Sequence, residues 1–120
     1  MAKKVLVVDD DPVGGKLVQS RLSKEGYDVI VATDGDIGLV ELRKNLPDLI
    51  VLDIEMPEMN GYSFIVEMKK DEAIQNTPVI VLTAHEENRA IFARRGIKHY
   101  LVKPVNFDLL FARIVELVGR

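Results

Sequence analysis

Short apolar runs recur at regular intervals along the chain, and they are rich in β-branched residues. They cover residues 5–8, 29–32, 49–52, 79–82 and 100–102. Because these runs are continuously apolar and do not alternate with polar residues, they are typical of strands that helices cover on both faces. The pattern therefore predicts five buried strands.

The stretch after the first strand has the signals of an amphipathic helix. Asp11 is placed to cap its N-terminus, Pro12 occupies its first turn, and Gly26 follows its end. Four apolar residues lie on one face, which we expect to pack on the sheet: Val13, Leu17, Val18 and Leu22. Asp11 is therefore interpreted as a helix cap rather than a metal ligand. The pair Gly14-Gly15 weakens the opening turn.

The last stretch also has helical periodicity. Apolar residues recur there at steps of three and four: Phe107, Leu110, Phe111, Ile114, Val115 and Val118. This spacing places an apolar stripe along one side of a helix. The dipeptides Asp34-Gly35 and Asn60-Gly61 mark where the second and third helices begin.

Strands and helices alternate along the whole chain, and this order determines the predicted architecture. Right-handed crossovers return the chain to the same sheet, so the pattern predicts an α/β three-layer sandwich with a five-stranded parallel sheet. With 120 residues and no linker or repeat, we expect one domain covering residues 1–120.

Composition narrows the function classes. Hydrophobic residues make up 48% and charged residues 29%, as in an ordinary folded domain, and the net charge of -3 argues against direct nucleic-acid binding. The sequence has no cysteine, which excludes disulfides and thiolate metal sites. The apolar runs are only strand-length, and no signal peptide precedes them. We expect a soluble, cytoplasmic protein with no membrane association.

Polar residues close four of the predicted strands. Asp9 and Asp10 follow the first strand, Asp53 the third, Thr83 the fourth and Lys103 the fifth. The carboxyl ends of parallel strands meet at one edge of the sheet, where open α/β sheets bind their ligands. We therefore expect three carboxylates, a hydroxyl and an ammonium group to converge there.

This set of groups suits phosphoryl transfer. Clustered carboxylates favour a hard divalent cation such as Mg²⁺, which attracts phosphate in turn. Asp53 can act as a nucleophile on phosphorus and form an acyl phosphate. Lys103 can pair with one phosphoryl oxygen, and Thr83 can donate a hydrogen bond to another.

Four motifs in this order resemble the receiver domains of two-component response regulators. They are Val-Val-Asp9-Asp10, Leu-Asp53-Ile-Glu-Met-Pro57-Glu-Met-Asn-Gly61, Val-Leu-Thr83-Ala84 and Tyr100-Leu-Val-Lys103-Pro104. The similarity covers essentially the whole chain. It implies the flavodoxin-like strand order 2-1-3-4-5.

The resemblance also implies a role for each matching residue. Asp53 would accept the phosphoryl group and Lys103 would contact it. Three ligands would bind Mg²⁺ directly, namely Asp10, Asp53 and the backbone carbonyl of Glu55, while Asp9 would bind through water. Thr83 and Tyr100 would form the switch pair, and the Lys103-Pro104 peptide would be cis.

The same resemblance implies partners. A histidine kinase or a histidine phosphotransfer protein would supply the phosphoryl group, and a downstream protein would respond to it. The domain would be a monomer or a weak dimer that depends on phosphorylation. It would not be an enzyme, apart from catalysing its own phosphoryl transfer and slow autodephosphorylation.

The interval from Thr83 to Lys103 departs from the family pattern. It is about two residues shorter than is common, and residues 95–99 replace the usual small and acidic residues with Arg-Gly-Ile-Lys-His. We expect a shortened fourth helix or a shortened loop before it. The usual partner face, formed by the fourth helix, fifth strand and fifth helix, would then be altered.

Two other functions use a similar fold or chemistry. A haloacid-dehalogenase-type hydrolase also has an Asp nucleophile, Mg²⁺, Thr and Lys, but its nucleophile follows the first strand and it needs a cap domain. A flavodoxin-type module needs a loop rich in Ser, Thr and Gly after the first strand. Here three aspartates, residues 9–11, would repel a flavin phosphate.

Overall fold

The computed structural model describes residues 2–54 and 61–120. Five strands form one sheet in the order β2-β1-β3-β4-β5, and all neighbouring strands are parallel. The strands are β1 (Lys4–Val8), β2 (Asp28–Ala32), β3 (Leu49–Asp53), β4 (Val79–Thr83) and β5 (His99–Val102). The helices are α1 (Pro12–Lys24), α2 (Gly35–Asn45), α3 (Gly61–Lys69), α4 (Arg89–Ala93) and α5 (Phe107–Val118).

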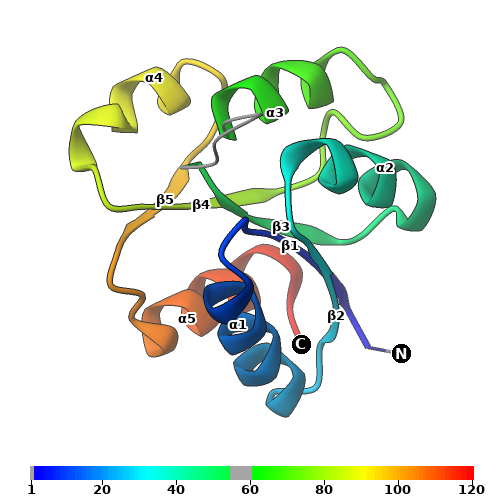
Figure 1. Cartoon of the computed structure of the whole chain (residues 1–120), viewed down its shortest axis with the longest axis vertical. Helices are drawn as coiled ribbons and strands as arrows, with labels where there is room; N and C mark the ends of the chain where they lie inside the picture. The colour runs from blue at the N-terminus through cyan, green and yellow to red at the C-terminus, as the bar shows by residue number, and fades with distance from the viewer. Residues whose placement is uncertain (1, 55–60) are drawn as a thin grey trace.

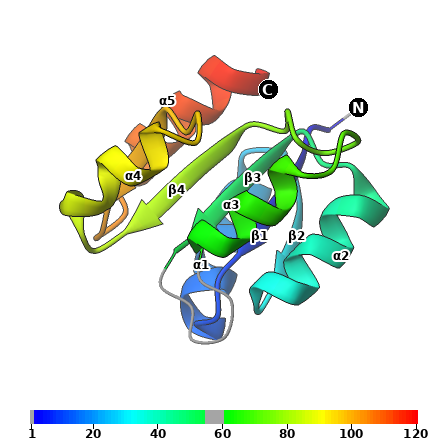
Figure 2. The same cartoon turned by 90° about the horizontal axis from the view of Figure 1, so that it is seen from above.

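Helices cover both faces of the sheet (Figure 1). α1 and α5 lie on one face, and α2, α3 and α4 lie on the other, as the view from above also shows (Figure 2). The predicted three-layer sandwich and the strand order 2-1-3-4-5 are both confirmed.

Each face of the sheet has its own apolar core, because successive side chains of a strand point to opposite faces. In β1, Leu6 and Val8 pack under α2 and α3, whereas Val5 and Val7 pack against α1 and α5. All four side chains are buried. This two-sided burial explains why the strands are continuously apolar in the sequence.

The start of α1 confirms the predicted capping. The Asp11 carboxylate accepts a hydrogen bond from the Val13 amide at 3.0 Å, and Pro12 is the first helical residue. These contacts satisfy an amide that would otherwise lack a partner at the helix N-terminus.

The predicted sheet-facing side of α1 is only partly right. Val18 and Leu22 are buried, but Val13 is 75% exposed and Leu17 is 51% exposed. The residues of α1 that face the sheet are Gly15, Val18 and Leu22, and Gly15 makes the first contact. A Cβ at Gly15 would lie 3.2 Å from Val31, so the close approach of α1 to the sheet explains this glycine.

The predicted stripe of α5 is also confirmed with one exception. Leu110 and Ile114 are fully buried, and Phe107, Phe111 and Val118 pack around them. Val115 lies at the edge of the stripe and is 39% exposed, while Leu117 packs in its place.

The predicted shortening of the fourth helix is confirmed. α4 has only five residues, and a single 3-10 turn (Glu86–Asn88) precedes it. Among the predicted helix starts, the Asp34 carboxylate caps α2, and α3 begins at Gly61. Asn60 lies outside the described residues. Within the described part of the chain, no helix is both long and apolar enough to cross a bilayer.

Candidate functional site

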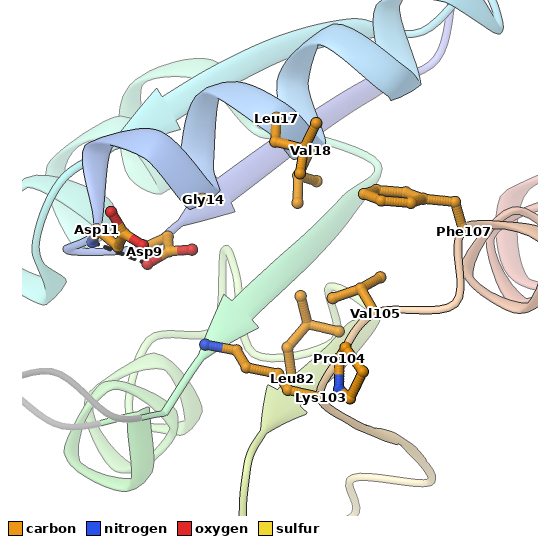
Figure 3. A pocket seen from close by; sticks show the side chains of 10 residues that line it. All are labelled: Asp9, Asp11, Gly14, Leu17, Val18, Leu82, Lys103, Pro104, Val105 and Phe107. Carbon is orange, nitrogen blue, oxygen red and sulfur yellow. Dashed lines mark hydrogen bonds between the residues drawn. The ribbon is translucent and has the colours of Figure 1, made fainter.

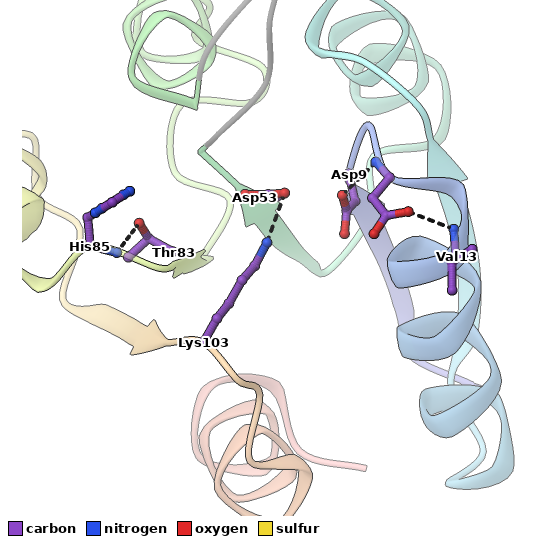
Figure 4. Close-up of polar contacts among 7 residues, drawn as sticks. Asp9, Val13, Asp53, Thr83, His85 and Lys103 are labelled. Carbon is purple, nitrogen blue, oxygen red and sulfur yellow. Dashed lines mark hydrogen bonds and ion pairs between the residues drawn. The ribbon is translucent and has the colours of Figure 1, made fainter.

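The carboxyl edge of the sheet brings the predicted polar residues together. One carboxylate oxygen from each of Asp9, Asp10 and Asp53 lies within 4.8 Å of the other two. Lys103 reaches Asp53 from the end of β5 (Figure 4). The convergence of the three carboxylates and the ammonium group, expected from the strand ends, is therefore observed.

Asp9 is held at the end of β1 by hydrogen bonds to both sides. Its backbone amide donates to the Ala32 carbonyl of β2 at 3.0 Å, and its carboxylate accepts from the Asp11 amide at 2.9 Å. Only 6% of the residue is exposed. The loop thus turns immediately after β1 and fixes this carboxylate inside the site.

The electrostatic environment of Asp9 disfavours its charge. Burial raises the pKa of this carboxyl from 3.8 to about 6, and the negative charge of Asp53 adds to the increase. The Asp11 amide and the Lys103 ammonium act in the opposite direction, but they do not outweigh burial. A carboxylate in this position gains from a cation placed beside it.

Asp53 ends β3 and forms an ion pair with Lys103, whose Nζ lies 3.1 Å from Oδ2. Asp53 is 4% exposed, whereas about a third of the Lys103 side chain is exposed. The Lys103 amide donates to the Thr83 carbonyl at 2.6 Å, and this bond aligns the end of β5 with the end of β4. The Lys103-Pro104 peptide is cis, as predicted.

Thr83 and Tyr100 lie on neighbouring strands, two positions apart in register, so their side chains point to the same face of the sheet. Thr83 is fully buried at the end of β4, and its hydroxyl accepts from the His85 amide at 3.0 Å. Tyr100 is 7% exposed, and its hydroxyl donates to the His85 carbonyl. Burial raises the pKa of the Tyr100 phenol, so it remains a donor at neutral pH. The structure therefore places the tyrosine inward, against the loop that follows Thr83.

A groove of about 310 Å³ opens beside the acidic cluster (Figure 3). Asp9 and Lys103 lie at its polar end. Its walls are mostly apolar and come from α1, β4, the segment before α5 and the first residue of α5: Gly14, Leu17, Val18, Leu82, Pro104, Val105 and Phe107. This groove was not predicted from the sequence. Leu17 was expected to pack on the sheet, and its apolar side chain was the one sequence signal of the groove.

Gly14 has a structural reason as well. A Cβ at this position would lie 3.0 Å from an Asp9 carboxylate oxygen and 3.3 Å from one of Asp11. The helix therefore begins close enough to the acidic cluster that a larger side chain would displace the Asp9 carboxylate. This proximity explains the glycine that helix propensity disfavours.

The donor set fits a hard divalent cation. Three carboxylates that can each offer one oxygen are the ligands that Mg²⁺ prefers. Glu55, predicted to contribute its backbone carbonyl, lies outside the described residues. Asp11 uses its carboxylate to cap α1, as expected.

Comparison with known proteins agrees with this geometry. The family described as the response regulator receiver domain matches residues 5–115. Response regulator PleD of Caulobacter vibrioides is 34% identical over 119 residues, which is 98% of this chain and 26% of that protein. The chain spans about a quarter of the length of PleD and about half of the length of other curated relatives that it matches.

Solved structures give the same result. Chemotaxis protein CheY4 of Vibrio cholerae has a TM-score of 0.91 and 30% identity, covering 98% of this chain and all of that one. Response regulator TrrA of Thermotoga maritima, solved in complex with Mg²⁺-BeF, has a TM-score of 0.87 and 34% identity, covering 97% of this chain and 99% of that one. These similarities decide against the hydrolase and flavodoxin alternatives.

Proposed function

Because the chain belongs to the response regulator receiver domain family, we propose that it is a signalling switch that accepts a phosphoryl group on Asp53. The donor would be a histidine kinase or a histidine phosphotransfer protein, and the reaction would require Mg²⁺. The observation that carries this proposal is the Asp53 carboxylate, buried between the other two aspartates and the Lys103 ammonium.

The chemistry assigns each side chain a step. An oxygen of Asp53 attacks phosphorus and forms the O–P bond of an acyl phosphate, while the N–P bond of the donor phosphohistidine breaks and the imidazole leaves. Lys103 moves from its ion pair with Asp53 to a phosphoryl oxygen. The Thr83 hydroxyl donates a hydrogen bond to a second oxygen, which stabilises the charge that develops there.

Magnesium, when bound, lowers the repulsion between the carboxylates and the incoming phosphoryl group. Asp10, Asp53 and the Glu55 carbonyl would bind it directly, and Asp9 would bind it through water. The raised pKa of Asp9 supports the fit, because a cation there compensates a carboxylate that the protein has desolvated.

The groove beside Asp53 supports a protein as the phosphoryl donor. Its apolar walls include Leu17, which is 51% exposed, and Val13 on the same helix is 75% exposed. An apolar helix that carries a phosphohistidine would bury these side chains and bring its phosphorus to the polar end of the groove.

The output of the switch would be a change in affinity for a downstream protein. Phosphorylation adds about two negative charges at the sheet edge and favours a hydrogen bond from Thr83, which stabilises Tyr100 in its inward position. We propose no turnover of an external substrate, no nucleic-acid or membrane binding, and a monomer or a weak phosphorylation-dependent dimer. The proposal includes a cytoplasmic location, which a sequence without cysteine suits.

The direct test is the variant Asp53→Asn, treated with acetyl phosphate and Mg²⁺ and examined by intact mass spectrometry. The wild-type chain should gain the mass of one phosphoryl group, and the variant should gain none, because an amide cannot form the acyl phosphate. Asp11→Asn is the matched control, since asparagine also caps a helix and the nucleophile is unchanged. Full modification of Asp53→Asn would refute the assignment.

A further inference from the structure

Three aromatic rings from three different elements pack in series on the face of the sheet covered by α3 and α4. Tyr62 of α3 meets Phe92 of α4 with ring centres 5.8 Å apart and planes at 76°. Phe92 then contacts Tyr100 of β5, with centres 6.3 Å apart. Phe92 and Tyr100 are almost completely buried. Because buried rings are close-packed, a displacement of one has to be accommodated by the next.

Two arginines connect this series to the short fourth helix and to the turn that follows it. The Arg95 guanidinium donates two hydrogen bonds to the Tyr62 hydroxyl, at 2.8 and 3.0 Å, and lies 5.3 Å from the centre of its ring. Arg89 lies 5.1 Å from the centre of the Tyr100 ring. Both contacts are of the cation–π kind. They tie the first residue of α4 to Tyr100 and the turn after α4 to Tyr62.

Both ends of the series also connect to the loops beside Asp53. The Tyr100 hydroxyl donates to the carbonyl of His85, whose amide donates to Thr83. At the other end, the Gly61 amide at the start of α3 donates to the carbonyl of Ile54 at 3.1 Å, and Ile54 directly follows Asp53. The aromatic series therefore joins the segment after β3 to the segment after β4.

We propose that Tyr62, Phe92 and Tyr100 move as one coupled unit, through which the state of Asp53 controls the position of α4 and reaches the surface of α3. Phe92 is the positioning residue, since it is the contact between the two tyrosines. Arg95 keeps α3 and the turn that follows α4 together. The inference rests on the proposed function and extends its output beyond the pair of Thr83 and Tyr100.

Fluorine NMR of the full chain labelled with 3-fluorotyrosine tests this coupling. The chain has three tyrosines, and the third, Tyr27, packs on the opposite face with its hydroxyl bonded to the Gly119 carbonyl. Tyr27 is therefore an internal reference. Single Tyr→Phe variants assign the three resonances. Addition of beryllofluoride with Mg²⁺ should shift the Tyr100 and Tyr62 resonances and leave that of Tyr27 in place.

Variants then separate coupling from a merely structural role. Phe92→Leu keeps an apolar side chain but removes the ring. The ligand-induced shift of Tyr62 should therefore fall to the part that the hydrogen bond between Gly61 and Ile54 transmits, while the shift of Tyr100 persists. Arg95→Gln should also strongly reduce the Tyr62 shift. Because Arg95 is exposed, this substitution leaves the packing of the buried core unchanged. Arg94→Gln is the matched control, because the neighbouring Arg94 is also exposed and forms no ion pair or side-chain hydrogen bond with the described residues.

Mass spectrometry of the acetyl phosphate reaction keeps the two proposals distinguishable. The coupling is overturned, and the switch function stands, if all chains are phosphorylated alike and one of two results is seen. Either the Tyr62 resonance of the wild-type chain does not shift, or it shifts as much in Phe92→Leu and Arg95→Gln as in the wild-type chain. If the wild-type chain gains no phosphoryl group and no tyrosine responds, the proposed function fails and the coupling fails with it.

Discussion

The two buried aspartates of the site show how single residues are adapted to bind a cation and a phosphoryl group. Asp53 has Lys103 as its charge partner at 3.1 Å. Asp9 is also buried, but its nearest compensation is one backbone amide, and its pKa rises to about 6. The folded protein is therefore more stable when the Asp9 carboxyl group is protonated or lies beside a metal ion.

This shift predicts the effect of pH on stability in metal-free buffer. The folded pKa of Asp9 lies above its unfolded value of 3.8, so between about pH 4 and pH 6 the folded state binds a proton that the unfolded state has released. The contribution of Asp9 to stability therefore decreases as pH rises through this range, and its full cost is present above pH 6.

Asp9→Asn should consequently be more stable than the wild-type chain at pH 7, by on the order of 2 kcal/mol, with the difference disappearing towards pH 4. Urea unfolding with EDTA at several pH values measures it. Asp28→Asn, which removes one carboxylate at an exposed residue of β2, is the control for the change in net charge. A constant difference between Asp9→Asn and wild type across this range would contradict the prediction.

A second residue-scale prediction ranks the metal ligands. Asp10→Ala should weaken Mg²⁺ binding more than Asp9→Ala, because the family pattern makes Asp10 a direct ligand and Asp9 a ligand through water. Loss of a water-mediated contact costs about tenfold in affinity, and loss of a direct ligand costs more. Magnesium titrations followed by NMR provide the comparison, and equal losses would show that the ranking is wrong.

At the scale of elements, close backbone approaches determine where helices begin relative to the site. α1 approaches the acidic cluster at Gly14, and α3 begins at Gly61 against the residue that follows Asp53. A Cβ at Gly61 would lie 2.3 Å from the Ile54 side chain and 2.5 Å from its Cα. The Ile54 Cα belongs to the backbone, which cannot move aside as a flexible side chain can.

Gly61→Ala should therefore destabilise the fold although alanine favours helices. The steric cost should exceed the helix-propensity gain, giving a net loss of about 3 kcal/mol. Urea unfolding followed by circular dichroism measures this loss. Ser20→Ala, at an exposed position of α1, serves as the control and should change stability little. Unchanged stability of Gly61→Ala would mean that α3 can shift away from Ile54.

At the scale of the whole molecule, the sheet separates two surfaces with different proposed roles. The apolar groove lies on the side of α1 and α5, whereas Tyr100 packs on the side of α3 and α4. The acidic cluster lies at the carboxyl edge of the sheet, between these surfaces. A phosphoryl donor can therefore bind on one side without covering the aromatic residues that we propose respond on the other.

Amide hydrogen exchange with and without beryllofluoride and Mg²⁺ tests this arrangement. Protection should change in residues 83–103 as well as around Asp9, Asp10 and Asp53, because Thr83 transmits the change to Tyr100. In Thr83→Ala the site loops should still respond, while the response of β5 should be lost. Changes confined to the site loops in the wild-type chain would show that the two strands are not coupled.

The sequence by itself determined the elements and most of the chemistry. Continuous apolar runs predicted buried strands, because burial on both faces leaves no alternation. The alternation of strands and helices along the chain predicted the parallel sheet. Asp9, Asp10, Asp53, Thr83 and Lys103 were predictable as one site, since the carboxyl ends of parallel strands meet at one edge. The switch role of Tyr100 came from family resemblance and stays a prediction.

Only the tertiary structure decided how the helices sit on the sheet. A helical period places Val13 and Leu17 near Val18, but the rotation of α1 that exposes them is set by the approach at Gly15. Likewise, Tyr62 is more than 25 residues away in the sequence from Phe92 and Arg95, which it contacts, and no local pattern connects them. Contacts between distant segments depend on how whole elements pack, and periodicity along one segment carries no information about that packing.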